Sequence, residues 1–216
     1  MRLPLGAQRL LAFLAVNEMP LLRSHVAEAL WPDSHRRQAN ANLRSALWRI
    51  RQARHNVLDA GSSRLSLAAG VTVDVRERAA LARGLLDRSA SWPSGALGSR
   101  TVTELSAELL RDWYDEWLFL ERDRWTQLRL HALEALAEHL LAAGEYSEAV
   151  EAALAAVWAE PLRESAHRIL VRVYAAEGNL SEAVRQYHRY RKLLHRELRT
   201  PPTAQMEELI RALTPR

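Results

Sequence analysis

The sequence predicts a mainly α-helical protein in two parts, a small winged helix-turn-helix followed by an all-helical domain with tetratricopeptide-like repeats. Three observations support this prediction: apolar residues at helical spacing along most of the chain, a short strand-like stretch within residues 65–75, and a repeat of 34 residues in the second part. The chain has 216 residues, 48% of them hydrophobic, and can bury a sizeable core. We expect residues 1–75 to form the first domain and residues 76–216 the second.

Three segments of the first part place apolar residues at helical spacing, namely residues 7–16, 24–31 and 35–54. A proline ends the second segment, because proline lacks an amide hydrogen and restrains the residue before it. Asp33 or Ser34 is then placed to cap the third helix.

The third helix is predicted to have two different faces. Its apolar stripe consists of Ala39, Leu43, Ala46, Leu47 and Ile50. The opposite side carries Ala41, Ser45, Trp48 and Gln52, flanked by Arg37, Arg44 and Arg49. One face is therefore expected to dock on the domain core, and the other to be free.

A change of pattern after the third helix predicts a small wing. Residues 61–63 read Gly-Ser-Ser and indicate a turn, while residues 65–67 and 71–75 alternate as short strands do. A further helix is expected to begin near Asp74. Residues 89–100 are rich in turn formers and are expected to be irregular.

The net charge of +4 is unevenly distributed, since residues 1–90 carry +7 and residues 91–216 carry −3. Six arginines and no acid lie between His35 and Val57, which is the electrostatic footprint expected of phosphate binding. The alternative is a solvated helix face in an arginine-biased chain, whose one lysine is Lys192. Cysteine is absent, which excludes disulfides and thiolate sites.

The repeat emerges when residues 142–150 are laid over residues 176–184, where six positions, one of them a glycine, are identical. An offset of 34 residues is the tetratricopeptide period, in which a small residue lies where two antiparallel helices cross closely. We expect the helices of residues 104–127 and 203–213 to cap the stack.

Three motifs in this order resemble the Streptomyces antibiotic regulatory proteins. They are VAEALWPD at residues 26–33 with NANLRSALWRIR at 40–51, LLRDWYDEW at 109–117, and AEPLRE at 159–164 continuing to Gly178 and Tyr187. The resemblance covers nearly the whole chain. It implies a bacterial activator that joins a winged helix-turn-helix to a bacterial transcriptional activation domain.

The resemblance also implies partners. Two protomers would bind direct repeats in double-stranded DNA as a head-to-tail homodimer, and would touch RNA polymerase and its sigma factor at promoters of antibiotic biosynthesis. The family places a small antiparallel sheet before the first helix, and here we expect that sheet to be missing or reduced.

Arginine suits such an interface, because its planar fork pairs with guanine edges and with phosphate. The predicted DNA-binding residues are Arg37, Asn42, Arg44, Ser45, Trp48, Arg49, Gln52 and, by likeness to the wing of the family, Arg64. For Trp48 the alternative is packing against the second domain, and for Arg64 it is an ordinary solvated turn. The predicted partner-binding residues are Tyr174, Tyr187 and Tyr190.

The sequence does not support an enzyme, since it has no phosphate-binding glycine loop and no nucleophile elbow. Its histidine pairs lie seven or eight residues apart, unlike metal ligands on a helix, so we expect no metal and no cofactor. We also expect a cytoplasmic protein without a membrane partner. Two rival interpretations are a protein-binding scaffold with a vestigial helix-turn-helix and a ligand-sensing regulator.

Overall fold

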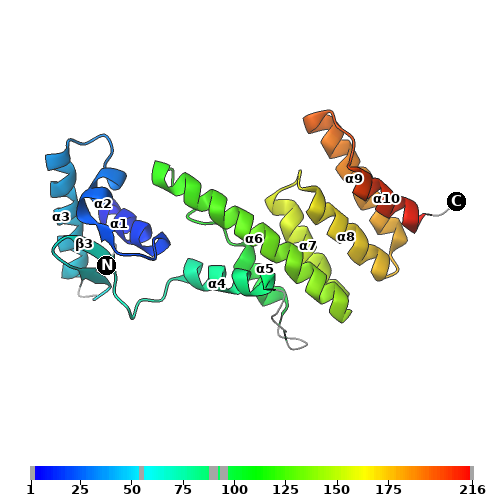
Figure 1. The fold of residues 1–216 in the computed structure, drawn as a ribbon, viewed down its shortest axis with the longest axis horizontal. Helices are drawn as coiled ribbons and strands as arrows, with labels where there is room; N and C mark the ends of the chain where they lie inside the picture. Colours follow the sequence, from blue (N-terminus) through cyan, green and yellow to red (C-terminus); the bar gives the residue numbers. More distant parts are fainter. Residues whose placement is uncertain (1–2, 54–55, 88–91, 93–96, 215–216) are drawn as a thin grey trace. The chain divides into compact units, whose positions relative to one another are not determined.

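The computed structural model describes residues 3–53, 56–87, 92 and 97–214, and within them it has ten helices and three short strands (Figure 1). The predicted mainly α-helical fold is confirmed. The chain divides into two compact units. The first consists of residues 1–77 and 109–123, and the second of residues 78–108 and 124–216.

The first unit contains the predicted trio of helices. They are α1 (Leu5–Val16), α2 (Arg23–Leu30) and α3 (Arg36–Gln52), each within two residues of its predicted bounds except that Arg54 lies outside the described residues. Their buried side chains form one core that also contains Leu65. The predicted cap of α3 is wrong, because His35 occupies the N-cap position and the cap has no side-chain hydrogen bond.

The wing is a three-stranded antiparallel sheet in the order β1-β3-β2, formed by Leu21–Leu22, Arg64–Leu67 and Leu58–Ala60. The turn predicted at residues 61–63 joins β2 to β3. The strand predicted at residues 71–75 is wrong. The amide of Val71 donates to the carbonyl of Ala68 at 3.0 Å, so the chain turns there and enters α4 instead of extending.

A segment distant in sequence completes the first unit. Arg9 of α1 forms an ion pair with Asp115, and the ring of Phe13 meets that of Trp117 edge to face at 5.1 Å between centroids. The sequence placed residues 109–123 in the second domain, and no pattern in the sequence indicated these contacts. The domain boundary at residues 75 and 76 stays a prediction.

Helices are the only regular elements among the described residues of the second unit. The elements that it contains or shares with the first unit are α4 (Asp74–Leu86), α5 (Ser99–Ser106), α6 (Glu116–Ala143), α7 (Tyr146–Ala159), α8 (Glu164–Ala176), α9 (Leu180–Leu198) and α10 (Ala204–Leu213). Helix α8 packs against both α7 and α9, and α10 closes the stack against α8 and α9 (Figure 1). Helix α5 already begins at Ser99, and residues 89–91 and 93–96 of the stretch expected to be irregular lie outside the described residues.

The 34-residue repeat appears as two equivalent helix ends. Gly144 has φ +77° after α6, and Gly178 has φ +91° after α8. The residue after each glycine donates its amide to a carbonyl five residues back, at 2.9 Å from Glu145 and 2.8 Å from Asn179. This is the Schellman arrangement, in which glycine accepts a left-handed conformation that strains other residues.

Replacing Gly178 by Ala should lower the free energy of unfolding by about 1–2 kcal/mol, because a Cβ is disfavoured at that positive φ. Gly70→Ala is the matched control, since Gly70 has no such φ and its Cβ would meet nothing within 4 Å. Urea unfolding of the full chain measures both. Equal stability of the two variants would contradict the assigned role of Gly178.

A buried histidine gives the second unit a pH dependence. The imidazole of His167 stacks on Tyr190 at 4.2 Å, and its Nδ1 and Nε2 lie 2.8 Å from Gln186 Nε2 and from the Pro161 carbonyl. Since the carbonyl can only accept and the amide nitrogen can only donate, this geometry requires the neutral ring. Burial lowers the pKa of His167 from its ordinary value, which opposes protonation of the folded protein.

The unfolded chain therefore binds a proton at His167 before the folded chain does. We expect the free energy of unfolding to decrease as the pH falls below about 6.5, the ordinary histidine pKa, and the loss to level off below the folded pKa. Comparing wild type with His167→Gln from pH 8 to pH 5 isolates this contribution. An NMR titration in which the His167 ring had a raised pKa would reverse the assigned sign.

Candidate nucleic-acid interface

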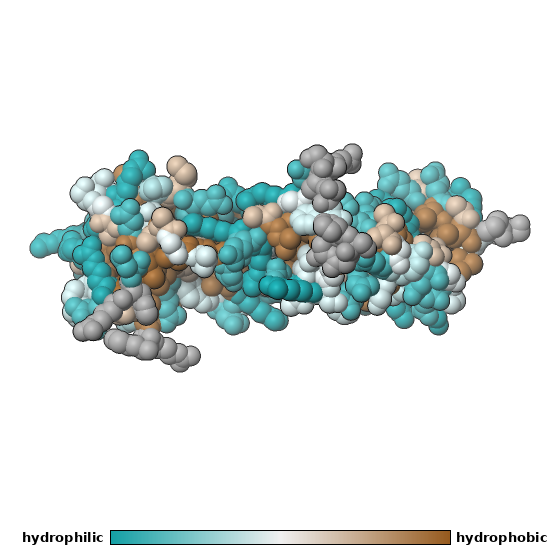
Figure 2. Space-filling model, turned by 90° about the horizontal axis from the view of Figure 1, so that it is seen from below, coloured by the Kyte–Doolittle hydropathy of each residue, from teal (hydrophilic) through white to brown (hydrophobic). Residues whose placement is uncertain are grey.

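Helix α3 separates its apolar and polar side chains cleanly. Its buried residues are the five predicted from the sequence: Ala39, Leu43, Ala46, Leu47 and Ile50. At 100° per residue these occupy an arc of roughly 100°, which leaves the rest of the circumference for polar groups. Hydrophilic residues also dominate the face of the molecule seen in Figure 2, where hydrophobic ones gather in separate patches.

Four of the exposed arginines of α3 lie along two edges of its outward face. Arg37, Arg44 and Arg51 follow one another at intervals of seven residues, which keeps them on one edge with a drift of roughly 20° per interval. Arg49 lies about 140° from Arg44, on the other edge. Within the described part of the chain none of these four guanidinium groups has an ion pair, so their charges face solvent.

Trp48 lies between the two edges and is 52% exposed. The guanidinium carbon of Arg49 lies 4.9 Å from the centroid of the Trp48 ring, a cation–π arrangement that pre-orients the arginine. Ser45 and Gln52 are exposed on the same side of the helix. Asn42 is half-buried, and its side-chain oxygen accepts a hydrogen bond of 3.0 Å from Gln38.

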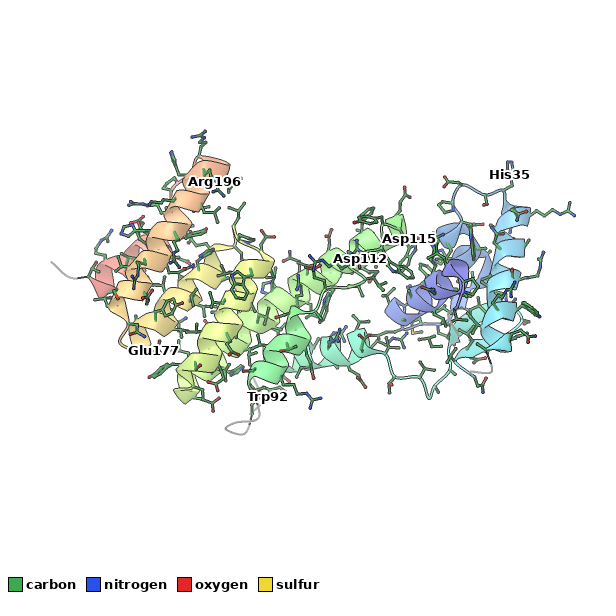
Figure 3. All side chains as sticks on the ribbon, turned by 180° about the vertical axis from the view of Figure 1, so that it is seen from behind. His35, Trp92, Asp112, Asp115, Glu177 and Arg196 are labelled. Carbon is green, nitrogen blue, oxygen red and sulfur yellow. The ribbon has the colours of Figure 1, made fainter. Side chains whose placement is uncertain are left out.

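The first turn of α3 adds the backbone amides of Arg36 and Arg37, which have no backbone acceptor among the described residues, whereas those of Gln38 and Ala39 donate to the His35 carbonyl. It begins after His35, labelled in Figure 3, and contains no acidic residue. Free amides at a helix N-terminus and the positive end of the helix dipole both attract anions. The outward face and the first turn can therefore receive negatively charged groups together.

The wing arginine is already engaged within the fold. Arg64 Nη1 donates to the carbonyl of Pro20 at 2.8 Å, and Arg23 Nε donates to the carbonyl of Gly61 at 3.1 Å. These bonds hold the β2–β3 turn next to β1. Arg64 remains exposed, but one of its donors serves the sheet.

The three tyrosines predicted to bind partners belong to the packing of the second unit. Tyr187 and Tyr190 are 5% and 2% exposed, and Tyr174 is half-buried. The Tyr187 hydroxyl donates to Glu207 at 2.6 Å, and burial raises the pKa of Tyr190 to about 12. This burial favours a packing role over partner binding.

Arg76 is a positioning residue that the sequence did not single out. Its guanidinium donates to the carbonyls of Leu14, Ala15 and Asn17 at 2.9, 2.9 and 2.7 Å. These carbonyls at the end of α1 thus receive hydrogen bonds from a residue some sixty positions away in the sequence. Because α1 packs on the buried face of α3, this contact supports the interface from behind. No spacing rule in the sequence predicts a contact between Arg76 and carbonyls so far away along the chain.

Two further classes of site were sought among the described residues. No group of three or more His, Cys, Asp or Glu side chains there could hold a metal ion. None of the helices in that part of the chain combines the length and the apolar character of a membrane span.

The comparisons with known proteins agree with one another. The profile of a family described as bacterial transcriptional activator domain matches residues 72–214. The regulatory protein AfsR of Streptomyces coelicolor is 31% identical over 198 residues, which cover 84% of this chain and 19% of AfsR. The chain thus spans about a fifth of the length of that relative.

A solved structure shares the fold. Mycobacterium tuberculosis EmbR, determined in complex with a low affinity phosphopeptide, superposes with a TM-score of 0.73 and 21% sequence identity. The match covers 99% of this chain and 60% of the EmbR chain.

The hydrogen bonds from Arg76 to the end of α1 provide a test of how the interface is supported. Arg76→Met should lower the free energy of unfolding by about 2 kcal/mol, because it removes a charged donor from three carbonyls. Arg83→Met, an exposed position on the same helix, should have little effect. Thermal unfolding of both variants is the measurement. Equal midpoints would show that the hydrogen bonds of Arg76 do not stabilise the fold.

Proposed function

The chain belongs to the bacterial transcriptional activator domain family, and on this premise we propose that it activates transcription by binding duplex DNA through α3. The observation that carries the proposal is the outward face of α3, where three arginines line one edge, Arg49 lies on the other, and no acid lies between His35 and Val57. Arginine serves both parts of such a contact, since it reads guanine in the major groove and pairs with phosphate.

The geometry of α3 supports different roles for its arginines in DNA binding. Arg37, Arg44 and Arg51 along one edge would contact a phosphate strand, while Arg49, held over the Trp48 ring, would reach a base edge. A major groove about 12 Å wide admits a helix of this kind. The free amides at the start of α3 would add a phosphate contact.

The finer parts of the proposal come from the family resemblance. Two protomers would bind direct repeats as a head-to-tail homodimer, and the second unit would engage RNA polymerase and its sigma factor. By the same resemblance, promoters of antibiotic biosynthesis are the target that we propose.

Binding to duplex DNA tests the proposal directly. Fluorescence anisotropy with a library of genomic fragments should yield fragments that bind more tightly than random duplexes of equal length. A folded protein that bound no fragment would favour the protein-binding scaffold instead.

Arg44→Ala and Arg49→Ala distinguish base contacts from phosphate contacts. A base contact should cost about 1–3 kcal/mol on the selected sequence and little on random DNA, whereas a phosphate contact should weaken both and lower the salt slope by about 1. We expect Arg49 to act as a base reader and Arg44 to bind phosphate.

Arg100→Ala is the matched control, because this side chain is exposed on α5 and pairs only with Glu104 among the described residues. Each variant is titrated on both duplexes across a salt series. Uniform losses for both α3 variants would refute base reading by these residues, and wild-type affinity in both would refute the proposed interface.

A further inference from the structure

A second basic surface lies on α9, in the half of the chain that carries a net charge of −3. The α9 stripe consists of Arg185, Arg189, Lys192, Arg196 and Arg199. The first four lie within α9 at separations of four, three and four positions, so they share an arc of roughly 60° and extend over about 17 Å of helix, and Arg199 follows at the C-cap. All five are exposed. Although the net charge of residues 91–216 is negative, positive charges are concentrated on this surface of α9.

Most of this charge is not neutralised within the protein. Arg185 pairs with Glu182, and Arg196 lies 2.7 Å from Glu197. Among the described residues Arg189, Lys192 and Arg199 form no ion pair. Both pairs that do form are exposed at the surface, where an ion pair contributes little and is readily exchanged for another anion.

The stripe ends at a basic hollow of about 600 Å³. The residues that line it are Arg191, Lys192, His195, Arg196, Arg199, Thr200 and Pro201, and none is acidic. Figure 3 labels Arg196 near this end of α9, where nitrogen-tipped side chains project away from the helix. The hollow thus lies among several cationic side chains, while its wall is mainly apolar.

The backbone at Arg199 provides an independent indication. Arg199 caps α9 in the left-handed conformation, with φ 57° and ψ 26°. Glycine adopts this conformation most easily, and it is the residue found at the equivalent ends of α6 and α8, at Gly144 and Gly178. An arginine at such a position is strained, and strain of this kind marks a candidate functional residue.

The composition of the surface distinguishes between two kinds of anionic partner. Interfaces with proteins have an apolar or aromatic centre, whereas interfaces with nucleic acids are polar and strongly positive. The only large hydrophobic side chain that is markedly exposed among residues 185–201 is Leu198, at 53%. A DNA strand presents a phosphate every 3.4 Å along its axis, so a stripe of about 17 Å of helix faces several of them.

We infer that the α9 stripe binds the phosphate backbone of duplex DNA without reading bases, as a second contact of the same chain. This inference extends the proposed DNA binding from α3 to the second unit. Arginine and lysine there would add affinity that depends on salt and not on sequence.

The test uses the full chain with Arg189, Lys192 and Arg196 all replaced by Gln. On a random duplex we expect weaker binding and a salt slope lower by about two to three, since each lost phosphate contact removes about 0.9. The ratio of affinities for selected and random DNA should stay unchanged. A chain with Arg83, Arg100 and Arg172 replaced by Gln carries the same charge change elsewhere and should keep the wild-type slope.

Arg199→Gly separates binding from folding. It relieves the left-handed strain, so the thermal midpoint should rise or stay equal while DNA affinity falls. Arg199→Lys keeps the charge and should retain most of the affinity. A variant Arg199→Gly that bound DNA as tightly as wild type would overturn the role of this residue, and a lower midpoint would make its role structural.

The outcomes separate this inference from the proposed function. If Arg44→Ala and Arg49→Ala weaken binding and the α9 variant keeps the wild-type slope, the α9 inference is overturned and the α3 proposal stands. If only the α9 variant loses binding, the α3 proposal fails and the α9 inference stands. An α9 variant that binds DNA normally but loses affinity for purified RNA polymerase would assign the stripe to a protein partner and overturn the inference.

Discussion

The docking of one apolar stripe of α3 is the constraint on which the rest of the first unit depends. Burial of Leu43, Leu47 and Ile50 contributes roughly 1.5–3 kcal/mol for each side chain. No other rotation of α3 buries these residues, so the arginines must face outward. The helix trio, the wing through Leu65, and Arg76 behind α1 all serve to hold that orientation.

The sequence predicted this orientation because a single physical rule governs it. The recurrence of apolar residues with the period of 3.6 residues per turn specifies which side of α3 is buried. The buried residues in the structure are those that this period predicted. The repeat was predictable for a similar reason, since Gly144 and Gly178 lie at helix ends that require a left-handed residue. In both cases the information is local, and neighbours in sequence suffice to express it.

The parts that sequence could not predict depend on contacts between distant segments. Strand β1 has only two residues, too few to alternate, and it exists because Leu21 and Leu22 pair with β3. The contacts of Arg9 and Phe13 with residues 115 and 117 join segments a hundred residues apart. The burial of Tyr187 and Tyr190 likewise depends on the packing of α8, α9 and α10, while their role in partner binding stays a prediction.

Among the described residues, two positions other than glycine have a left-handed backbone, Leu110 and Arg199. Leu110 has φ 45°, but Arg122 donates to its carbonyl and, at 2.9 Å, to that of Leu109, so the fold compensates the strain locally. Arg199 has φ 57° and, among the described residues, no side-chain hydrogen bond that would compensate it. Because strain without internal compensation persists where it serves a function, the contrast between Leu110 and Arg199 argues that the benefit at Arg199 comes from outside the chain. The surrounding cations indicate the kind of benefit, since a cluster of arginine and lysine side chains attracts an anion.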